Sequence, residues 1–577
     1  MHMSQGMAYA LLGHVPPVTG IYMAFVPLMV YAIFGTSRHC SMGTFAVVCL
    51  MTGSIVEKYA NAKELRNGTV IPEGDFGENE TLYTNIDVAI AVSLAVAFIQ
   101  LGMFVLQMGM VANLFSEALV SGFTCGAAMH VFTSQLKELL GVPIRRRSGI
   151  FRIILVLKDV FTAIPQANAI AVTISVVCVT FLMLCDIFLK PYLAKKTIIP
   201  FPAELSVVIL GTAMSYSLDL NQKRNVNIIN YIPLGIPAPI LPSIEMVKRV
   251  TLESIAVTIV SYAIAISMVL LLAQKVGYET DANQEILALS LSNLAGSVFQ
   301  CMPVSASLSR SFIQMNTGGS TQMATLVSCL VLCMVLLWIG PLFEPLPLAI
   351  LSSVVVVALR RMLLQVRDIK RFWLGNIWDG LTWIVSFFVT VIVDVSIGLA
   401  AGITVNVLGL VVRGYRGNQY ILGNVPNTDL YEDIKRHKKC VEFEGLKIFR
   451  YAGCIQFLTK LRFRNTLFEA VGINPLEILD RQQRKKKVDD ELENFDIYCV
   501  IVDMSSVPYV DPSGVILIDY CIKDYRKIGI EVLLACLTGA VFEEIQKCKR
   551  NGSIKENFGI FVTIHDAVIY AQAVLKK

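Results

Sequence analysis

The stretch Val304–Gln314 reads VSASLSRSFIQ and places one arginine, Arg310, among serines in a strongly apolar chain. Of the 577 residues, 55% are hydrophobic and 16% are charged, and the mean hydropathy is +0.62. Soluble domains are about one-quarter charged, so this composition indicates a membrane protein. A charge inside a membrane helix costs at least about 2.5 kcal/mol, which makes Arg310 a functional candidate. A buried ion pair, or a side chain that extends to the membrane interface, is the structural alternative.

Apolar runs recur throughout residues 1–413, and several approach the roughly 20 residues that cross a bilayer. Lipid cannot satisfy backbone N–H and C=O groups, so these runs are expected to be helices. The first segment lacks the charged start and cleavage site of a signal peptide and reads as the second half of a membrane helix. We predict fourteen segments, at residues 1–13, 17–35, 42–58, 87–110, 115–135, 168–189, 202–217, 250–275, 282–301, 304–314, 322–341, 346–362, 377–394 and 397–413.

The third and tenth of these segments, 42–58 and 304–314, are too short or too interrupted to be simple spans. Broken segments at corresponding positions of two halves are typical of transporters built from inverted repeats. The sequence similarity between the halves is weak, so the repeat is inferred from position in the count.

Segment 59–86 is expected outside the cell, because it is acidic and carries two N-glycosylation patterns, at Asn67 and Asn79. Alternation of the spans then places most basic clusters inside, as the positive-inside rule prefers. The cluster Arg145–Arg147 falls outside; it either attracts anions to an outer mouth or is a plain exception to a statistical rule. The residues predicted inside are Lys190, Lys195, Lys196, Arg360, Arg361, Arg367, Lys370 and Arg371.

The C-terminal region has a different character. We predict a membrane domain at 1–413, a linker at 414–440 and a cytosolic domain at 441–577, which alternates strand and helix patterns as α/β domains do. A charge-rich stretch near 476–495 is expected to be a solvated, mobile insert.

Several classes of function are disfavoured. The 14 cysteines show no repeated C-x-x-C spacing and read as packing residues, so no metal site is predicted. The net charge of +5 is small and scattered, which gives no reason to expect a nucleic-acid partner. The sequence contains no phosphate-binding loop, and its C-terminal region shows no plausible nucleophile–base pair, so neither a cofactor nor an enzyme activity is expected.

Four long motifs resemble the sulfate permease (SulP) family of anion transporters, which includes prestin and pendrin. SQGMAYALLGHVPPVTGIY (4–22) and FGTSRHCSMGTFAVV (34–48) resemble its first half, and residues 277–322, from GYETDANQE to NTGGSTQ, its second-half signature. IVDMSSVPYVDPSGV (501–515) resembles the centre of its STAS domain. The motifs occur in order along nearly the whole chain.

This resemblance implies an all-α membrane domain of fourteen helices in two inverted seven-helix repeats, followed by a cytosolic α/β STAS domain. The first helix is expected to be truncated, which departs from the family pattern. It implies a plasma-membrane homodimer with STAS contacts, in which a core domain moves against a gate domain like an elevator. The implied function is secondary active exchange of inorganic or dicarboxylate anions such as sulfate, oxalate, chloride and bicarbonate. An uncoupled anion channel and a prestin-like voltage-driven motor are the alternatives.

The resemblance also implies an anion site where the N-termini of the third and tenth helices face each other. Helix N-termini carry about half a positive charge and free N–H groups, so two of them attract an anion. Arg310 would add a full charge and Ser309 a hydroxyl; Phe45 would offer its ring edge, and Gln5 and Tyr9 their polar groups. Plain core packing is the alternative for both aromatic residues. The predicted site residues are Gln5, Tyr9, Thr44, Phe45, Ala46, Ser307, Leu308, Ser309 and Arg310.

Two further points concern mechanism and modification. The eighth apolar run has no carboxylate in its middle, and Glu253 and Glu204 lie near the ends of runs, so we expect transport without an obligatory cation. In the motif Asp511–Gly514, Ser513 resembles a serine that is phosphorylated in bacterial STAS relatives. The more ordinary interpretation is that Ser513 caps the following helix.

Overall fold

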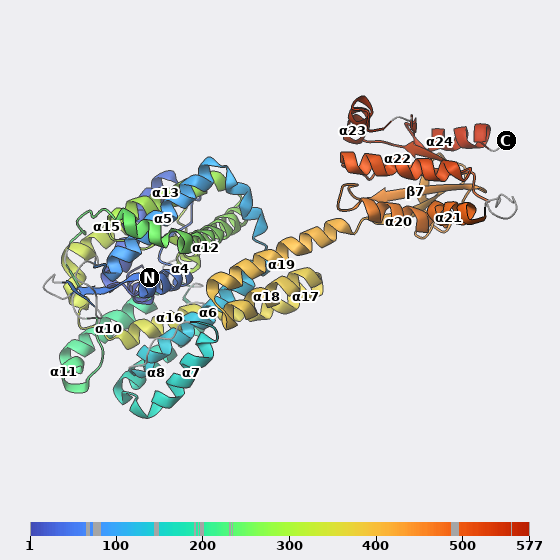
Figure 1. Cartoon of the computed structure of the whole chain (residues 1–577). Helices are drawn as coiled ribbons and strands as arrows, with labels where there is room; N and C mark the ends of the chain where they lie inside the picture. Colours follow the sequence, from blue (N-terminus) through green and yellow to red (C-terminus); the bar gives the residue numbers. More distant parts are fainter. Residues whose placement is uncertain are drawn as a thin grey trace. The chain divides into compact units, whose positions relative to one another are not determined.

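Helices make up most of residues 1–407 in the computed structural model of the chain, and the remainder is a smaller unit with a β-sheet (Figure 1). The two units are Met1–Val407 and Leu408–Lys577. The structure describes residues 2–575 apart from 65–69, 73–81, 143–148, 190–191, 194–195, 197–200, 230–231, 234, 486–495 and 555–556.

Each predicted membrane segment contains a helix, and most ends agree with prediction within a few residues. In the described residues, seven helical stretches are long and apolar enough to cross a membrane on their own, and Ala203–Leu218 and Ile377–Ile392 are shorter apolar helices. The helices are α1 (His2–Leu12), α2 (Pro17–Met23), α3 (Val26–Phe34), α4 (Ala46–Tyr59), α5 (Asn85–Val105), α6 (Glu117–Leu140), α8 (Ala169–Leu184), α10 (Ala203–Leu218), α12 (Ile244–Val276), α13 (Ala282–Val298), α14 (Leu308–Asn316), α15 (Met323–Met334), α16 (Leu348–Leu363), α18 (Ile377–Ile392) and α19 (Val395–Tyr415).

Three further helices were not predicted: α7 (Arg152–Ala163), α11 (Leu220–Arg224) and α17 (Asp368–Gly375). Helices α7 and α17 leave large apolar side chains exposed, such as Phe161 and Leu374, and with 12 and 8 residues each is too short to span a membrane alone. A search for apolar runs misses them because their apolar residues occupy one face only.

The helices of the membrane unit pack in two groups (Figure 1). In the group that we call the core bundle, α13 packs on α5 and α3, α12 packs on α5, and α1 packs on α2. In the gate bundle, α6 packs on α16 and α18, and α16 packs on α8. The two bundles meet where α1 contacts α16 and where α4 contacts α6.

Glycine allows the closest approach in the core bundle. A Cβ atom placed on Gly20 of α2 would lie 1.9 Å from the carbonyl oxygen of Gly6 in α1. A Cβ on Gly6 would lie 2.7 Å from the carbonyl oxygen of Gly20. No side chain fits between these backbones, so the pair fixes the position of α1 against α2.

The second unit contains a six-stranded mixed sheet in the order β10-β9-β8-β7-β5-β6. Its strands are β5 (Asn418–Asn424), β6 (Tyr431–Asp433), β7 (Leu446–Ala452), β8 (Cys499–Asp503), β9 (Glu531–Ala535) and β10 (Gly559–Phe561). Strands β7 to β10 are parallel neighbours, whereas β5 pairs antiparallel with both β7 and β6. The segment 414–440, predicted to be a linker, therefore contributes two strands, because its backbone groups pair with β7 and with each other.

Helices α20 (Lys460–Val471), α21 (Pro475–Lys485), α22 (Pro512–Lys527), α23 (Gly539–Arg550) and α24 (Ile564–Tyr570) complete this unit. The stretch 476–495 was expected to be a mobile insert, but its first half forms α21. Ile478 is buried there, and α21 packs on α22, which explains why the segment is ordered. Residues 486–495 lie outside the described part of the chain.

Candidate anion-binding site

A pair of two-residue strands lies at the centre of the core bundle and joins its two halves. Strand β1 (Met42–Gly43) precedes α4, and β4 (Ser305–Ala306) precedes α14. The strands pair antiparallel, with Met42 opposite Ala306 and Gly43 opposite Ser305. Because a helix begins within three residues of the end of each strand, this register brings the N-termini of α4 and α14 to the same β1–β4 pair.

Two hydrogen bonds extend the pairing beyond the strands. The amide of Ser307 donates to the carbonyl oxygen of Ser41 over 3.1 Å. The amide of Ser41 donates over 2.9 Å to the hydroxyl of Ser311, which itself donates to the carbonyl oxygen of Ser307 over 2.8 Å. Ser307 and Ser311 therefore join the two arms.

Both helices begin without a side-chain cap. The N-cap residues are Phe45 for α4 and Ser307 for α14, and neither makes a side-chain hydrogen bond to its helix. Ala46 and Val47, which open α4, are at most 1% exposed. The first N–H groups of a helix have no partner within the helix, so these two N-termini present buried donors at one place.

Arg310 reaches from α14 to the arm that leads into α4. Its guanidinium donates to the hydroxyl of Thr44 over 3.3 Å, and to the carbonyl oxygens of Thr44 and Met42 over 3.2 and 3.4 Å. Gly43, at a φ of +139°, passes directly beneath it, since a Cβ there would lie 2.9 Å from Nη2. Any larger residue at position 43 would displace the guanidinium.

Within the described part of the chain, the charge of Arg310 has no partner of opposite sign. The residue is only 4% exposed, and among the described residues no carboxylate forms an ion pair with it. Its Nε atom is buried without a hydrogen-bond partner in the same part of the chain. A buried, uncompensated cation costs several kcal/mol, which a bound anion would offset.

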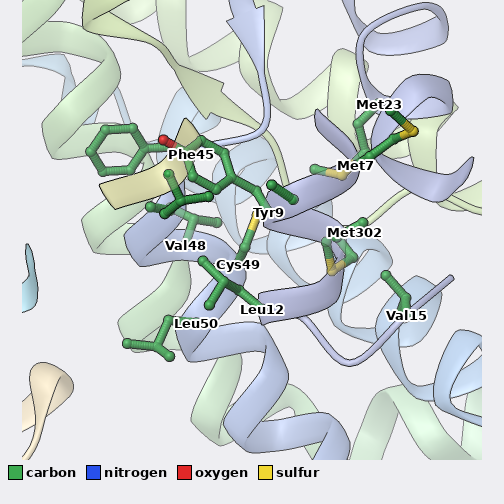
Figure 2. Close-up of a cluster of buried hydrophobic side chains, with 14 of the residues drawn as sticks. Met7, Tyr9, Leu12, Val15, Met23, Phe45, Val48, Cys49, Leu50 and Met302 are labelled. Atoms are coloured by element: carbon green, nitrogen blue, oxygen red, sulfur yellow. The ribbon is translucent and has the colours of Figure 1, made fainter. Parts of the chain in front are cut away.

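Helix α1 contributes the other predicted residues. Gln5 and Tyr9 are buried, at 2% and 7% exposed. The buried Oε1 atom of Gln5 lacks a hydrogen-bond partner among the described residues. Tyr9 and Phe45 belong to one cluster of buried side chains, together with Met7 (Figure 2). The aromatic residues thus pack as core residues do, and they lie beside the paired helix starts.

The structure places the remaining predictions as follows. Thr44, Ala46 and Ser307 are buried at the two helix starts. Leu308 and Ser309 form the first turn of α14, and their side chains lie outside what the structure describes. The glycosylation candidates Asn67 and Asn79, the cluster Arg145–Arg147, and Lys190 and Lys195 lie outside the described residues.

In the second unit, the interpretation of Ser513 as a helix cap is wrong. Asp511 is the N-cap of α22, and its carboxylate accepts from the amide of Gly514 over 2.7 Å. The hydroxyl of Ser513 donates to the same carboxylate over 3.1 Å. Aspartate is as good an N-cap as serine and comes first in this motif, so the serine is left in the first turn.

One buried carboxylate of the membrane unit, Glu285, was missed in the sequence analysis. Glu253 of α12 accepts from Lys58 at 2.5 Å and from Tyr59 at 3.1 Å, so it belongs to an ion pair at the end of α4. Glu285 of α13, by contrast, is 1% exposed and accepts hydrogen bonds from Tyr31, Thr36 and Ser37. A lone carboxylate inside an apolar segment is the signal that would have found it.

Two half-helices that meet inside a helical membrane domain define a transporter of the inverted-repeat class. Comparison with protein-family models gives the sulfate permease family over residues 1–386 and the STAS domain over residues 437–567. The chain belongs to the sulfate permease family of anion transporters, which are not enzymes, and it carries a C-terminal STAS domain.

Individual relatives agree with this assignment. Solute carrier family 26 member 10 of Mus musculus is 33% identical over 582 residues, which cover 100% of this chain and 82% of that protein. Solute carrier family 26 member 6 of Homo sapiens is 34% identical over 495 residues, which cover 85% of this chain and 64% of that protein. The structure of SLC26A9 matches with a TM-score of 0.88 at 30% identity, over 99% of this chain and 88% of that one. The chain is thus a multi-pass membrane protein with the SLC26A9 fold.

Proposed function

We propose that this protein exchanges inorganic or dicarboxylate anions, such as sulfate, oxalate, chloride and bicarbonate, at a site between the N-termini of α4 and α14. The observation that carries the proposal is the buried guanidinium of Arg310, which has neutral partners and no carboxylate among the described residues. An anion beside it would also accept hydrogen bonds from the uncapped N–H groups of both helices.

The same chemistry favours exchange over one-way transport. Without an anion, the protein would have to carry a buried positive charge and two sets of unpaired N–H groups through the membrane interior. Each unpaired buried polar group costs about 1–3 kcal/mol, and an unpaired charge costs more. The reorientation of a loaded site is therefore easier than that of an unloaded one, and net transport becomes a swap of one anion for another.

In the transport cycle that we propose, the core bundle carries the site past the gate bundle in an elevator-like movement. Helix α1 lies at the contact between the bundles, since it packs on both α2 and α16. Gln5 and Tyr9 then contribute polar groups from α1, and Phe45 contributes the positive edge of its ring. The proposed cycle needs no obligatory cation.

The cellular setting belongs to the same proposal. We infer a plasma-membrane homodimer with the STAS domain in the cytosol, contacts through that domain, and glycans on Asn67 or Asn79. Phosphorylation of Ser513 would add negative charge in the first turn of α22, which the helix dipole favours and the neighbouring Asp511 carboxylate opposes.

The test is anion uptake into proteoliposomes that contain the purified protein and are preloaded with chloride. Labelled sulfate, oxalate and chloride should enter by exchange, and Arg310→Gln should lower uptake at least tenfold while Arg310→Lys keeps part of it. Arg249→Gln is the matched control, because Arg249 is an exposed arginine on α12 paired with Glu245. Equal uptake by Arg310→Gln and by the control would refute the proposal.

A further inference from the structure

Helix α13 anchors the loop that leads into β1. The carboxylate of Glu285 accepts from the amides of Thr36 and Ser37 over 2.7 and 3.0 Å, from the Thr36 hydroxyl over 2.5 Å and from the Tyr31 hydroxyl over 2.8 Å. Charge-assisted bonds of this kind are about twice as strong as neutral ones. Glu285 therefore fixes the backbone at Thr36 and Ser37, a few residues before β1.

The other side of this loop is held from α15. Gln322, the N-cap residue of α15, donates from its amide to the carbonyl oxygens of Ser37 and Cys40 over 2.7 and 3.0 Å. Thr325 in turn donates to the Gln322 side chain over 2.6 Å. Two amides and two carbonyl groups of the loop thus have side-chain partners, which fix its path into β1.

The same helix α13 anchors the opposite arm. The carbonyl oxygen of the Asn293 side chain accepts from the amide of Val304 over 2.9 Å, immediately before β4. The Asn293 amide group donates to Gln100 over 2.9 Å, and Ser261 donates to the carbonyl oxygen of Val304 over 2.6 Å. Asn293 is fully buried, so these bonds have no competition from water.

Glu285 and Asn293 are eight residues apart on one helix, which corresponds to about 12 Å along its axis. One helix therefore holds both arms of the β1–β4 pair at a fixed separation. We propose that Glu285 and Asn293 are positioning residues that set the distance between the N-termini of α4 and α14, and with it the affinity for the anion. This inference rests on the proposed function, because it concerns the same site.

For Glu285→Gln, the proposal predicts a change in anion affinity opposite to the change that simple electrostatics predicts. A negative charge in the same bundle repels a bound anion, so its removal by Glu285→Gln should strengthen binding if charge alone matters. As a positioning residue, Glu285 accepts hydrogen bonds from two backbone amides. Glutamine cannot replace it fully, because its side chain has only one acceptor oxygen and its nitrogen is a donor. Positioning therefore predicts that Glu285→Gln weakens anion binding.

The first readout is exchange in proteoliposomes, measured over a range of external sulfate and chloride. We expect Glu285→Gln to raise KM at least fivefold and to change kcat less. Thr36→Val removes one hydroxyl donor and leaves the charge, so it should raise KM by a smaller factor, and it serves as the second variant if Glu285→Gln fails to fold. Asn293→Ala should also raise KM. Glu279→Gln, an exposed carboxylate between α12 and α13, is the matched control.

The second readout does not depend on transport. Cys40 is fully buried between the anchored residues Thr36 and Ser37 and strand β1. Loss of the anchor should expose its thiol, so N-ethylmaleimide should label Cys40 at least tenfold faster in Glu285→Gln than in the wild type or in Glu279→Gln. Peptide mapping by mass spectrometry identifies the labelled cysteine among the 14 in the chain.

The two readouts separate failure of this inference from failure of the proposed function. If the wild type transports none of the anions while Cys40 labelling rises in Glu285→Gln, the anchor is real and the function is wrong. An unchanged or lower KM in Glu285→Gln, or Cys40 labelling equal to that of the control, would overturn the positioning role.

Discussion

Replacement of Gly20 by alanine tests the contact that holds α1 in place. The new Cβ would lie 1.9 Å from the Gly6 carbonyl oxygen, whereas ordinary contact begins at 3.4 Å, so the helices must separate by about 1.5 Å. Overpacking typically costs about 1–3 kcal/mol, and a rigid backbone atom as the obstacle places this variant at the upper end. Because α1 carries Gln5 and Tyr9, we also expect weaker anion binding.

Two further glycines make this a graded series. Gly6→Ala meets its obstacle at 2.7 Å and should cost less than Gly20→Ala. Gly102→Ala, in α5, has no atom within 4 Å of the new Cβ and should be neutral or slightly stabilising, since alanine favours a helix. In the assay, the purified full chain is heated in detergent, and the fraction of protein that remains monodisperse is measured at each temperature. If Gly20→Ala survived heating as well as Gly102→Ala, the close approach of α1 and α2 would be refuted.

Three predictions concern the STAS domain. Asp511→Ala removes the cap of α22 and should cost about 1 kcal/mol, whereas Ser513→Ala should change little; amide hydrogen exchange in α22 compares them. Burial raises the pKa of Cys499 and of Cys521 to about 12, so iodoacetamide at pH 9 should label both only after unfolding. Each thiol ionises near pH 9 in the unfolded chain but stays protonated in the folded domain. The free energy of unfolding of the STAS domain should therefore fall as the pH rises from about 9 towards 12. Asp503→Asn, at a fully buried carboxylate, should destabilise the domain by about 1–3 kcal/mol, measured by thermal unfolding.

The membrane helices could be predicted because lipid imposes a simple rule on their sequences. A span must be apolar over its length, so α5 and α12 are visible in the sequence as apolar runs. Strands β5 and β6 are not constrained in this way, so their sequences are not visibly apolar. Asn418–Asn424 is short and begins and ends with asparagine, and it becomes a strand only because β7 offers it a partner.

The candidate site divides in the same way. Arg310 is recognisable from sequence because a charge among serines and apolar residues is conspicuous. Glu285 is equally charged and more buried, yet its role depends on Thr36 and Ser37, which lie 249 and 248 residues earlier in the chain. Contacts between residues so far apart in the chain depend on how the whole bundle packs. They cannot be predicted from the sequence around either residue.

The antiparallel β1–β4 pair has a consequence for symmetry, because two strands in this arrangement are exchanged by a two-fold rotation. Met42 begins one strand and Ser305 the other, so the residue that corresponds to Arg310 on the first arm is Val47. Val47 is apolar and fully buried. The two strands at the site are thus related by a two-fold rotation while the charge is one-sided, and an anion held there should rest off that axis, on the side of α14.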